Sequence, residues 1–261
     1  MKRLFLMALA IILMLGMATP AFATPATNAP PAIPRTAAGR DQRIANVQEN
    51  FSVSIDFLIG ANIEDEHIFL DNLEQSLNLM GPRFVNLLAQ RFDHVNRNLA
   101  GGGSASSRIP IAAIVVQNSP RLGGASHHGG IVFQPSTRLA DIPLWIYFHE
   151  FGHLLDFAVS YVNTPLGYVL AENRTGDHRL LYELGASVPI HNSTVALEAY
   201  ADIFAELMLN RNLGSHLDSR IQWNNTHRRI VFNDIQNFAG NGSRATQRAA
   251  NFLNIELPAA S

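Results

Sequence analysis

The pentapeptide His149-Glu150-Phe151-Gly152-His153 brings together residue types that can bind and use a metal ion. On an α-helix, residues four apart lie on the same face, so the two imidazoles can share one cation. Glu150 is turned about 100° around the helix and can reach a water beside the cation without binding it. This spacing is typical of helical zinc sites in which the glutamate is a general base. We therefore expect His149 and His153 to bind one catalytic Zn²⁺ and Glu150 to accept a proton.

The residues around this motif predict a buried helix. Residues 144–162 contain no proline and are apolar on nearly all sides. His149, His153 and Asp156 form a polar stripe on this helix, and a buried polar stripe needs partners, which a metal ion would supply. Gly152 costs about 1 kcal/mol in a helix interior, so its presence favours the close approach of another backbone.

A catalytic zinc site needs a third protein ligand and one open position. The metzincin pattern requires a glycine three residues after the second histidine and a histidine six residues after it. Those positions hold Asp156 and Val159, which excludes that class. The Gly-Thr-x-Asp run of enzymes with an aspartate ligand is also absent. A glutamate ligand remains.

Glu198, Glu172 and Glu183 are the candidates for this third ligand. Glu198 stands in residues 193–212, which lack glycine and proline and predict a second buried helix. Asp202, one turn later, can accept the spare N–H of a ligand histidine. Glu172 and Glu183 lie in a region broken by glycine and proline, and neither has such a neighbour. We favour Glu198.

The remaining pattern predicts an α+β fold that is mostly helical, with a small sheet and the active-site helix described above. Apolar residues at helical intervals and β-branched runs suggest the following elements. We expect helices within residues 42–99, 179–184, 229–238 and 244–253, and strands at 109–116 and 130–134.

The segment 129–133, just before the metal helix, is the candidate edge strand for substrate. An extended peptide can add to an exposed sheet edge, and glycines let its backbone come close. His127 and His128 precede this segment and either line the cleft or lie in solvent. We therefore expect an extended peptide or protein substrate as partner.

The N-terminus has the features of a secretory signal. Lys2 and Arg3 precede a short apolar run, and Ala21-Phe22-Ala23 fits the small-x-small cleavage rule. We expect a signal peptide at 1–23, a Pro/Ala-rich linker at 24–40 and the folded domain at 41–261. The mature protein should be secreted, with no stable membrane association.

Composition limits the function classes further. The 261 residues are 15% charged with a net charge of −2, so no basic surface indicates nucleic-acid binding. The chain has no cysteine, which excludes disulfides, thiol nucleophiles and cysteine-ligated metals. We expect a single globular domain and a monomer.

Together, His-Glu-Phe-Gly-His and the segment Glu198-Ala-Tyr-Ala-Asp202 resemble the catalytic domain of anthrax lethal factor and the related secreted Pro-Pro endopeptidases. Glu198 follows His153 by 45 residues. The resemblance extends over roughly residues 41–255, and its specific motifs lie within 149–206. It implies a zincin-like metalloprotease fold, with His149, His153 and Glu198 as zinc ligands and Glu150 as base. It also implies a secreted zinc endopeptidase that acts on protein substrates, with Pro-Pro bonds among the candidates.

The chain departs from this family at one position. The family has a tyrosine seven residues before the ligand glutamate, where its hydroxyl supports the oxyanion, and here that residue is His191. Histidine can donate the same bond, so we expect His191 to be catalytic, with Tyr182, Tyr200 and His178 as alternatives. Two other functions stay open: a secreted binding or surface protein that keeps zinc without catalysis, and a toxin-like effector protease.

Overall fold

The computed structural model describes residues 33–58, 61–99, 107–115, 124–127, 130–135, 137–160 and 178–258. A compact unit begins at Pro34. Helix α2 (Ala37–Asn50) starts inside the expected linker, where the Thr36 side chain accepts a hydrogen bond from the Gly39 N–H and caps the helix. The folded domain therefore begins before Asp41. The expected signal peptide at 1–23 lies outside the described residues.

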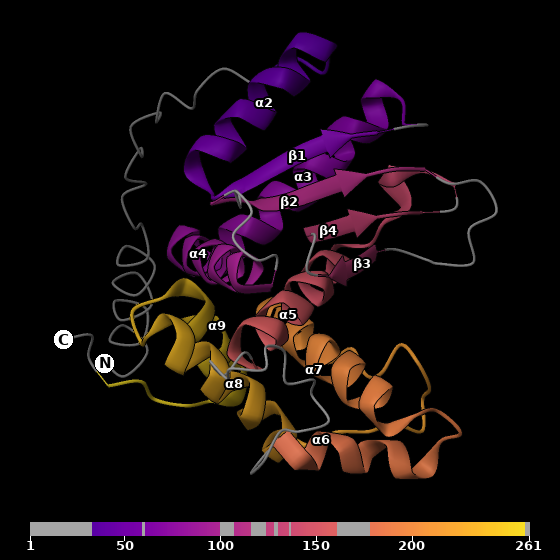
Figure 1. Cartoon of the computed structure of the whole chain (residues 1–261), viewed down its shortest axis with the longest axis vertical. Helices are drawn as coiled ribbons and strands as arrows, with labels where there is room; N and C mark the ends of the chain where they lie inside the picture. The colour runs from indigo at the N-terminus through magenta and orange to yellow at the C-terminus, as the bar shows by residue number, and fades with distance from the viewer. Residues whose placement is uncertain are drawn as a thin grey trace, which may run out of the picture. The chain divides into compact units, whose positions relative to one another are not determined.

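The domain is α+β and mostly helical, as the sequence predicts, and its strands form one mixed sheet (Figure 1). The strands are β1 (Val53–Phe57), β2 (Ile109–Ala113), β3 (Gly124–His127) and β4 (Gly130–Phe133), in the order β1-β2-β4-β3. β1, β2 and β4 are parallel, and β3 pairs antiparallel with β4. The expected strands at 109–116 and 130–134 are confirmed as β2 and β4.

The helical expectation for residues 42–99 is wrong at β1. Val53 and Ile55 are buried and alternate with more exposed residues, which is the two-residue repeat of a strand. Residues on both sides of β1 are helical, as expected.

The expectation that residues 129–133 form an edge strand is also wrong. β4 lies between β2 and β3, so both of its sides are paired. Gly130 has φ 122°, and a Cβ there would lie 2.3 Å from the Pro110 carbonyl oxygen. The glycine thus permits the approach of β2, and β3 is the strand at that edge of the described sheet. Gly129, His128 and the His127 side chain lie outside what the structure describes.

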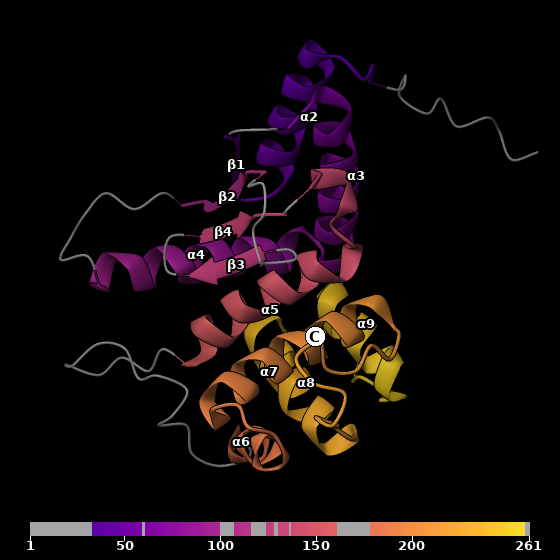
Figure 2. The same cartoon turned by 90° about the vertical axis from the view of Figure 1, so that its right-hand side faces the viewer.

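The helices form two groups on either side of α5 (Leu144–Ser160). The remaining helices are α3 (Ile63–Met80), α4 (Pro82–Leu99), α6 (Arg179–Glu183), α7 (Asn192–Leu209), α8 (Asn225–Ala239) and α9 (Arg244–Leu253), with short 3₁₀ turns η1 (Leu139–Asp141) and η4 (Leu184–Ser187). α2, α3, α4 and the sheet lie on one side of α5, and α6 to α9 lie on the other (Figures 1 and 2). The helix that carries His149 and His153 is therefore central.

Aromatic side chains join α5 to the sheet. Phe69 of α3, Phe133 of β4 and Tyr147 of α5 pack with ring centroids 4.7–5.3 Å apart and are fully buried. Such contacts hold the helix in a fixed place against the strands. None of the helices in the described part of the chain has the length and apolar character that crossing a bilayer would require.

Candidate metal centre

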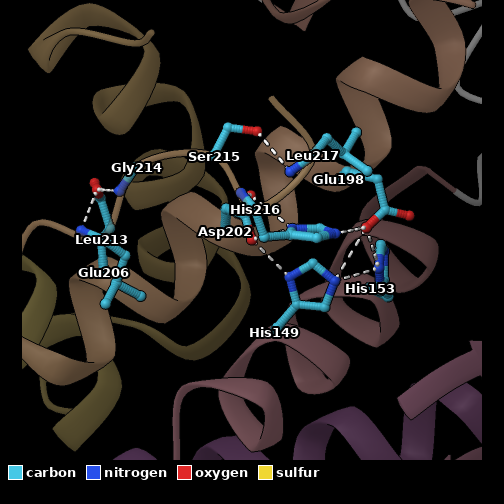
Figure 3. Close-up of polar contacts among 10 residues, drawn as sticks. All are labelled: His149, His153, Glu198, Asp202, Glu206, Leu213, Gly214, Ser215, His216 and Leu217. Atoms are coloured by element: carbon cyan, nitrogen blue, oxygen red, sulfur yellow. Dashed lines mark hydrogen bonds and ion pairs between the residues drawn. The ribbon is translucent and has the colours of Figure 1, made fainter. Parts of the chain in front are cut away.

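The centre forms where α5 and α7 cross at Gly152. A Cβ at Gly152 would lie 2.9 Å from the Ala201 Cα and 3.0 Å from the Phe204 Cβ, so only glycine fits without movement. The close approach of another backbone predicted for Gly152 is therefore confirmed. This crossing brings Glu198 on α7 next to the two histidines of α5 (Figure 3).

The three expected ligands converge through one atom each. The Glu198 Oε2 lies 3.1 Å from the His149 Nε2 and 3.5 Å from the His153 Nε2. The two Nε2 atoms are 3.0 Å apart. A tetrahedral zinc ion with bonds of roughly 2.0–2.1 Å places its ligand atoms about 3.3 Å apart. The donor types and their spacing therefore fit one Zn²⁺ (Figure 3).

Asp202 orients the first histidine. Its Oδ1 lies 2.9 Å from the His149 Nδ1, and both side chains are buried. The imidazole donates its Nδ1–H to this carboxylate, which directs its Nε2 toward Glu198. A carboxylate behind a histidine ligand fixes its tautomer and raises its basicity. The contact is the one that the sequence spacing predicts.

The charges of these groups are strongly coupled. Burial alone would disfavour a charged His149, but hydrogen bonds to Asp202 and Glu198 outweigh it and raise the pKa of His149 to about 10. Burial likewise opposes ionisation of Glu198, yet its bonds to His149 and His153 hold the pKa of that carboxyl well below its usual range. The pKa of Asp202 is lowered for the same reason, by His149 and His216 against burial. Both carboxylates are therefore ionised at neutral pH and attract a cation.

Glu150 is buried on α5 next to His149 in the sequence. Its negative charge also helps to raise the pKa of His149, but its effect is smaller than those of burial and of the hydrogen bonds to Asp202 and Glu198. The carboxylate is thus near the centre without belonging to the group of close donor atoms formed by His149, His153 and Glu198. A general base must lie within hydrogen-bond reach of the water that it deprotonates, so the role of Glu150 as the base stays a prediction.

His216 completes the surroundings of the centre, and sequence reasoning missed it. Its Nδ1 lies 2.9 and 3.0 Å from the two Asp202 oxygens, and its backbone N–H donates to the Asp202 Oδ2 at 3.2 Å. Its Nε2 lies 3.4 Å from the Glu198 Oε2 (Figure 3). The residue follows α7 in an irregular loop, and no motif spacing marks it. The only signal is a histidine soon after an acidic helix.

Glu206 holds the loop that carries His216. Its Oε1 accepts the N–H groups of Leu213 and Gly214 at 2.8 and 3.1 Å. Its Oε2 accepts from the Trp223 Nε1 and the Arg228 Nε at 2.9 and 2.8 Å. Glu206 is fully buried, so these bonds are costly to lose. Three acidic residues spaced four apart on α7 thus have separate tasks: Glu198 is a candidate ligand, Asp202 orients histidines, and Glu206 anchors the loop.

Four residues were expected as possible hydrogen-bond donors to the oxyanion, and the structure does not group the histidines among them with the paired histidines. His191 is exposed at the N-cap of α7 and belongs to neither group of close donor atoms, so its role is still only predicted. The Tyr200 hydroxyl and the His178 Nε2 both bind the Asp234 Oδ2, at 2.9 and 2.8 Å. These two side chains form a separate contact with α8. Tyr182 lies on α6.

The alternative glutamate ligands gain no support. Glu183 is exposed and pairs with Arg179 at 4.0 Å. Glu172 lies outside the described residues. Of the glutamates that the structure describes, Glu198 is the one grouped with the paired histidines. Comparison with protein-family models and with curated proteins finds no match for this sequence.

Proposed function

We propose that the protein is a secreted zinc endopeptidase of the zincin type that hydrolyses peptide bonds in protein substrates, with Pro-Pro bonds among the candidates. One observation carries this proposal. Two histidines of α5 and a glutamate of α7 place their donor atoms within 3.5 Å of one another, with a second carboxylate, Glu150, on the same helix as the histidines.

The residues divide the chemistry between them. His149, His153 and Glu198 would hold the zinc, which when bound supplies a Lewis acid that activates water and polarises the scissile carbonyl. Asp202 keeps His149 in the ligand tautomer. The Glu150 carboxylate accepts a proton from the attacking water and delivers it to the leaving amine nitrogen, so the base is regenerated in each cycle.

The edge strand β3 offers a place for an extended substrate. It packs beside α5 in the described domain and pairs with β4 along one side only (Figure 2). A peptide added along its other side would run next to the metal helix. In this proposal β3 takes the role that the sequence pattern suggested for residues 129–133.

The Glu150→Gln variant tests the proposal directly. We expect it to retain one zinc per chain but to cleave peptides about 10²–10⁴-fold more slowly, because the amide cannot accept the proton. A peptide-library digest with and without a chelator, together with elemental analysis, measures both quantities. Glu183→Gln, at an exposed glutamate away from the centre, should behave as wild type. Peptide cleavage by Glu150→Gln at the wild-type rate would refute the mechanism.

One observation favours a second candidate, a secreted binding protein with a zinc site that has no catalytic role. Structural zinc sites have four protein ligands, and His216 places a further imidazole nitrogen beside Glu198. The two candidates differ in whether His216 binds the metal. A chelator-sensitive peptidase activity would decide for the enzyme.

A further inference from the structure

We propose that His216 is a catalytic residue whose Nε2 donates a hydrogen bond to the substrate carbonyl oxygen as that oxygen gains negative charge. This inference rests on the proposed peptidase function and gives His216 the task that the sequence pattern suggested for His191. It assigns a role to a residue that no motif in the chain marks.

The position of His216 suits this role. Its ring is perpendicular to His149 at 4.8 Å, much as the His153 ring is at 4.6 Å. Its donor atoms group with His149 and Asp202, whereas the candidate ligands group as His149, His153 and Glu198. His216 therefore shares His149 with the candidate ligands but is not grouped with His153 and Glu198. Its side chain is 32% exposed, whereas that of His149 is 6% exposed, so a substrate can reach it.

The ring is also held in a fixed orientation. Asp202 binds the His216 side chain and its backbone N–H, and the Trp145 ring packs against it at 5.8 Å. Glu206 anchors the same loop through two backbone N–H groups. Asp202 lies at its Nδ1 and Glu198 at its Nε2, so each ring nitrogen faces a carboxylate (Figure 3). A donor that needs no reorganisation during the reaction stabilises an oxyanion most effectively.

The kinetic test compares two substitutions at His216. His216→Phe keeps a ring without a donor, and we expect kcat to fall about 10²–10³-fold with KM changed less than about threefold. His216→Gln keeps a donor and should recover about tenfold of that loss. His227→Phe is the matched control, because His227 contacts Asn224 at the start of α8 and belongs to neither group of close donor atoms. It should retain wild-type rates.

Two measurements do not depend on turnover. His216→Phe should keep one metal per chain and leave the visible absorption of the Co²⁺-substituted protein unchanged. Methylphosphonate, a tetrahedral oxyanion, should bind the Co²⁺-substituted variant about tenfold more weakly than it binds the Co²⁺-substituted wild type. The His227→Phe variant should bind it normally.

The outcomes separate the two proposals. Loss of metal or an altered Co²⁺ spectrum in His216→Phe would make His216 a ligand and overturn the inference. So would wild-type phosphonate affinity in that variant, or a wild-type kcat. If the wild type cleaves no peptide but binds methylphosphonate in a His216-dependent way, the peptidase proposal fails while the contact assigned to His216 stands.

Discussion

At the scale of single residues, Asp202 holds two imidazoles at once. Its carboxylate contacts the Nδ1 atoms of His149 and His216 and one backbone N–H. A single negative charge thus sets the tautomer of a candidate ligand and the orientation of its neighbour.

Asp202→Asn should weaken zinc binding about 10–100-fold, because the neutral amide cannot stabilise both Nδ1–H donors. Competition with a chromophoric chelator measures the affinity. Asp218→Asn is a suitable control, since Asp218 lies close by in sequence and pairs with Arg220. Equal zinc affinity in Asp202→Asn and wild type would show that Asp202 does not support the ligand.

The protonation of His149 predicts how zinc affinity depends on pH. Its pKa is raised to about 10 in the metal-free protein, so below that pH the Nε2 must lose a proton before it can bind zinc. Affinity should therefore increase with pH, by about tenfold per unit between pH 6 and 8. Titrations at several pH values test this, and calorimetry in two buffers should detect the released proton. A flat profile would contradict it.

At the scale of elements, the crossing of α5 and α7 determines the distance between the histidines and Glu198. Ala201 and Phe204 of α7 pack directly against Gly152. α5 carries two candidate ligands and the proposed base, and α7 carries the third candidate ligand and Asp202. Any increase in the separation of the helices moves the donors apart.

Gly152→Ala should therefore impair folding and metal binding together. Overpacking typically costs about 1–3 kcal/mol, and the better helix propensity of alanine offsets about 1 kcal/mol of it. We expect a lower free energy of unfolding, measured by urea denaturation, and weaker zinc affinity. If Gly152→Ala matched the wild type in both measurements, the close contact would not control the site.

At the scale of the whole domain, a bound zinc would connect the two helices that line the centre. α5 packs against the sheet, and α7 packs against α8 and α9, so the metal would tie together elements distant in the sequence. A ligand that binds only the native state stabilises it by mass action.

Metal removal should consequently lower the thermal stability. At free zinc about 1,000-fold above its Kd, the linkage amounts to about 4 kcal/mol, or a fall in Tm of about 8–16 °C for a domain of this size. Calorimetry with and without a chelator measures the change. His153→Ala should lose the metal by elemental analysis, and its Tm should not respond to the chelator. A chelator-independent Tm in the wild type would exclude a stabilising metal.

The sequence by itself predicted the helix of His149 and His153, the candidate ligand Glu198 and the place of Asp202 beside a histidine. These assignments follow from the 3.6-residue repeat, which places residues four apart on one helix face in any fold. The sequence also predicted that another backbone approaches Gly152 closely. The two-residue alternation of β1 was present, but apolar residues in the following helix obscured it.

Only the tertiary structure decided which strand lies at the sheet edge and which histidine borders the centre. Strand order depends on long-range pairing, so β4 became interior and β3 became the edge. The place of His216 depends on the contacts of Asp202 and Glu206 with a loop whose conformation no local repeat specifies. Helical periodicity is local and therefore readable in the sequence, whereas the position of a loop is set by the groups that it meets after folding.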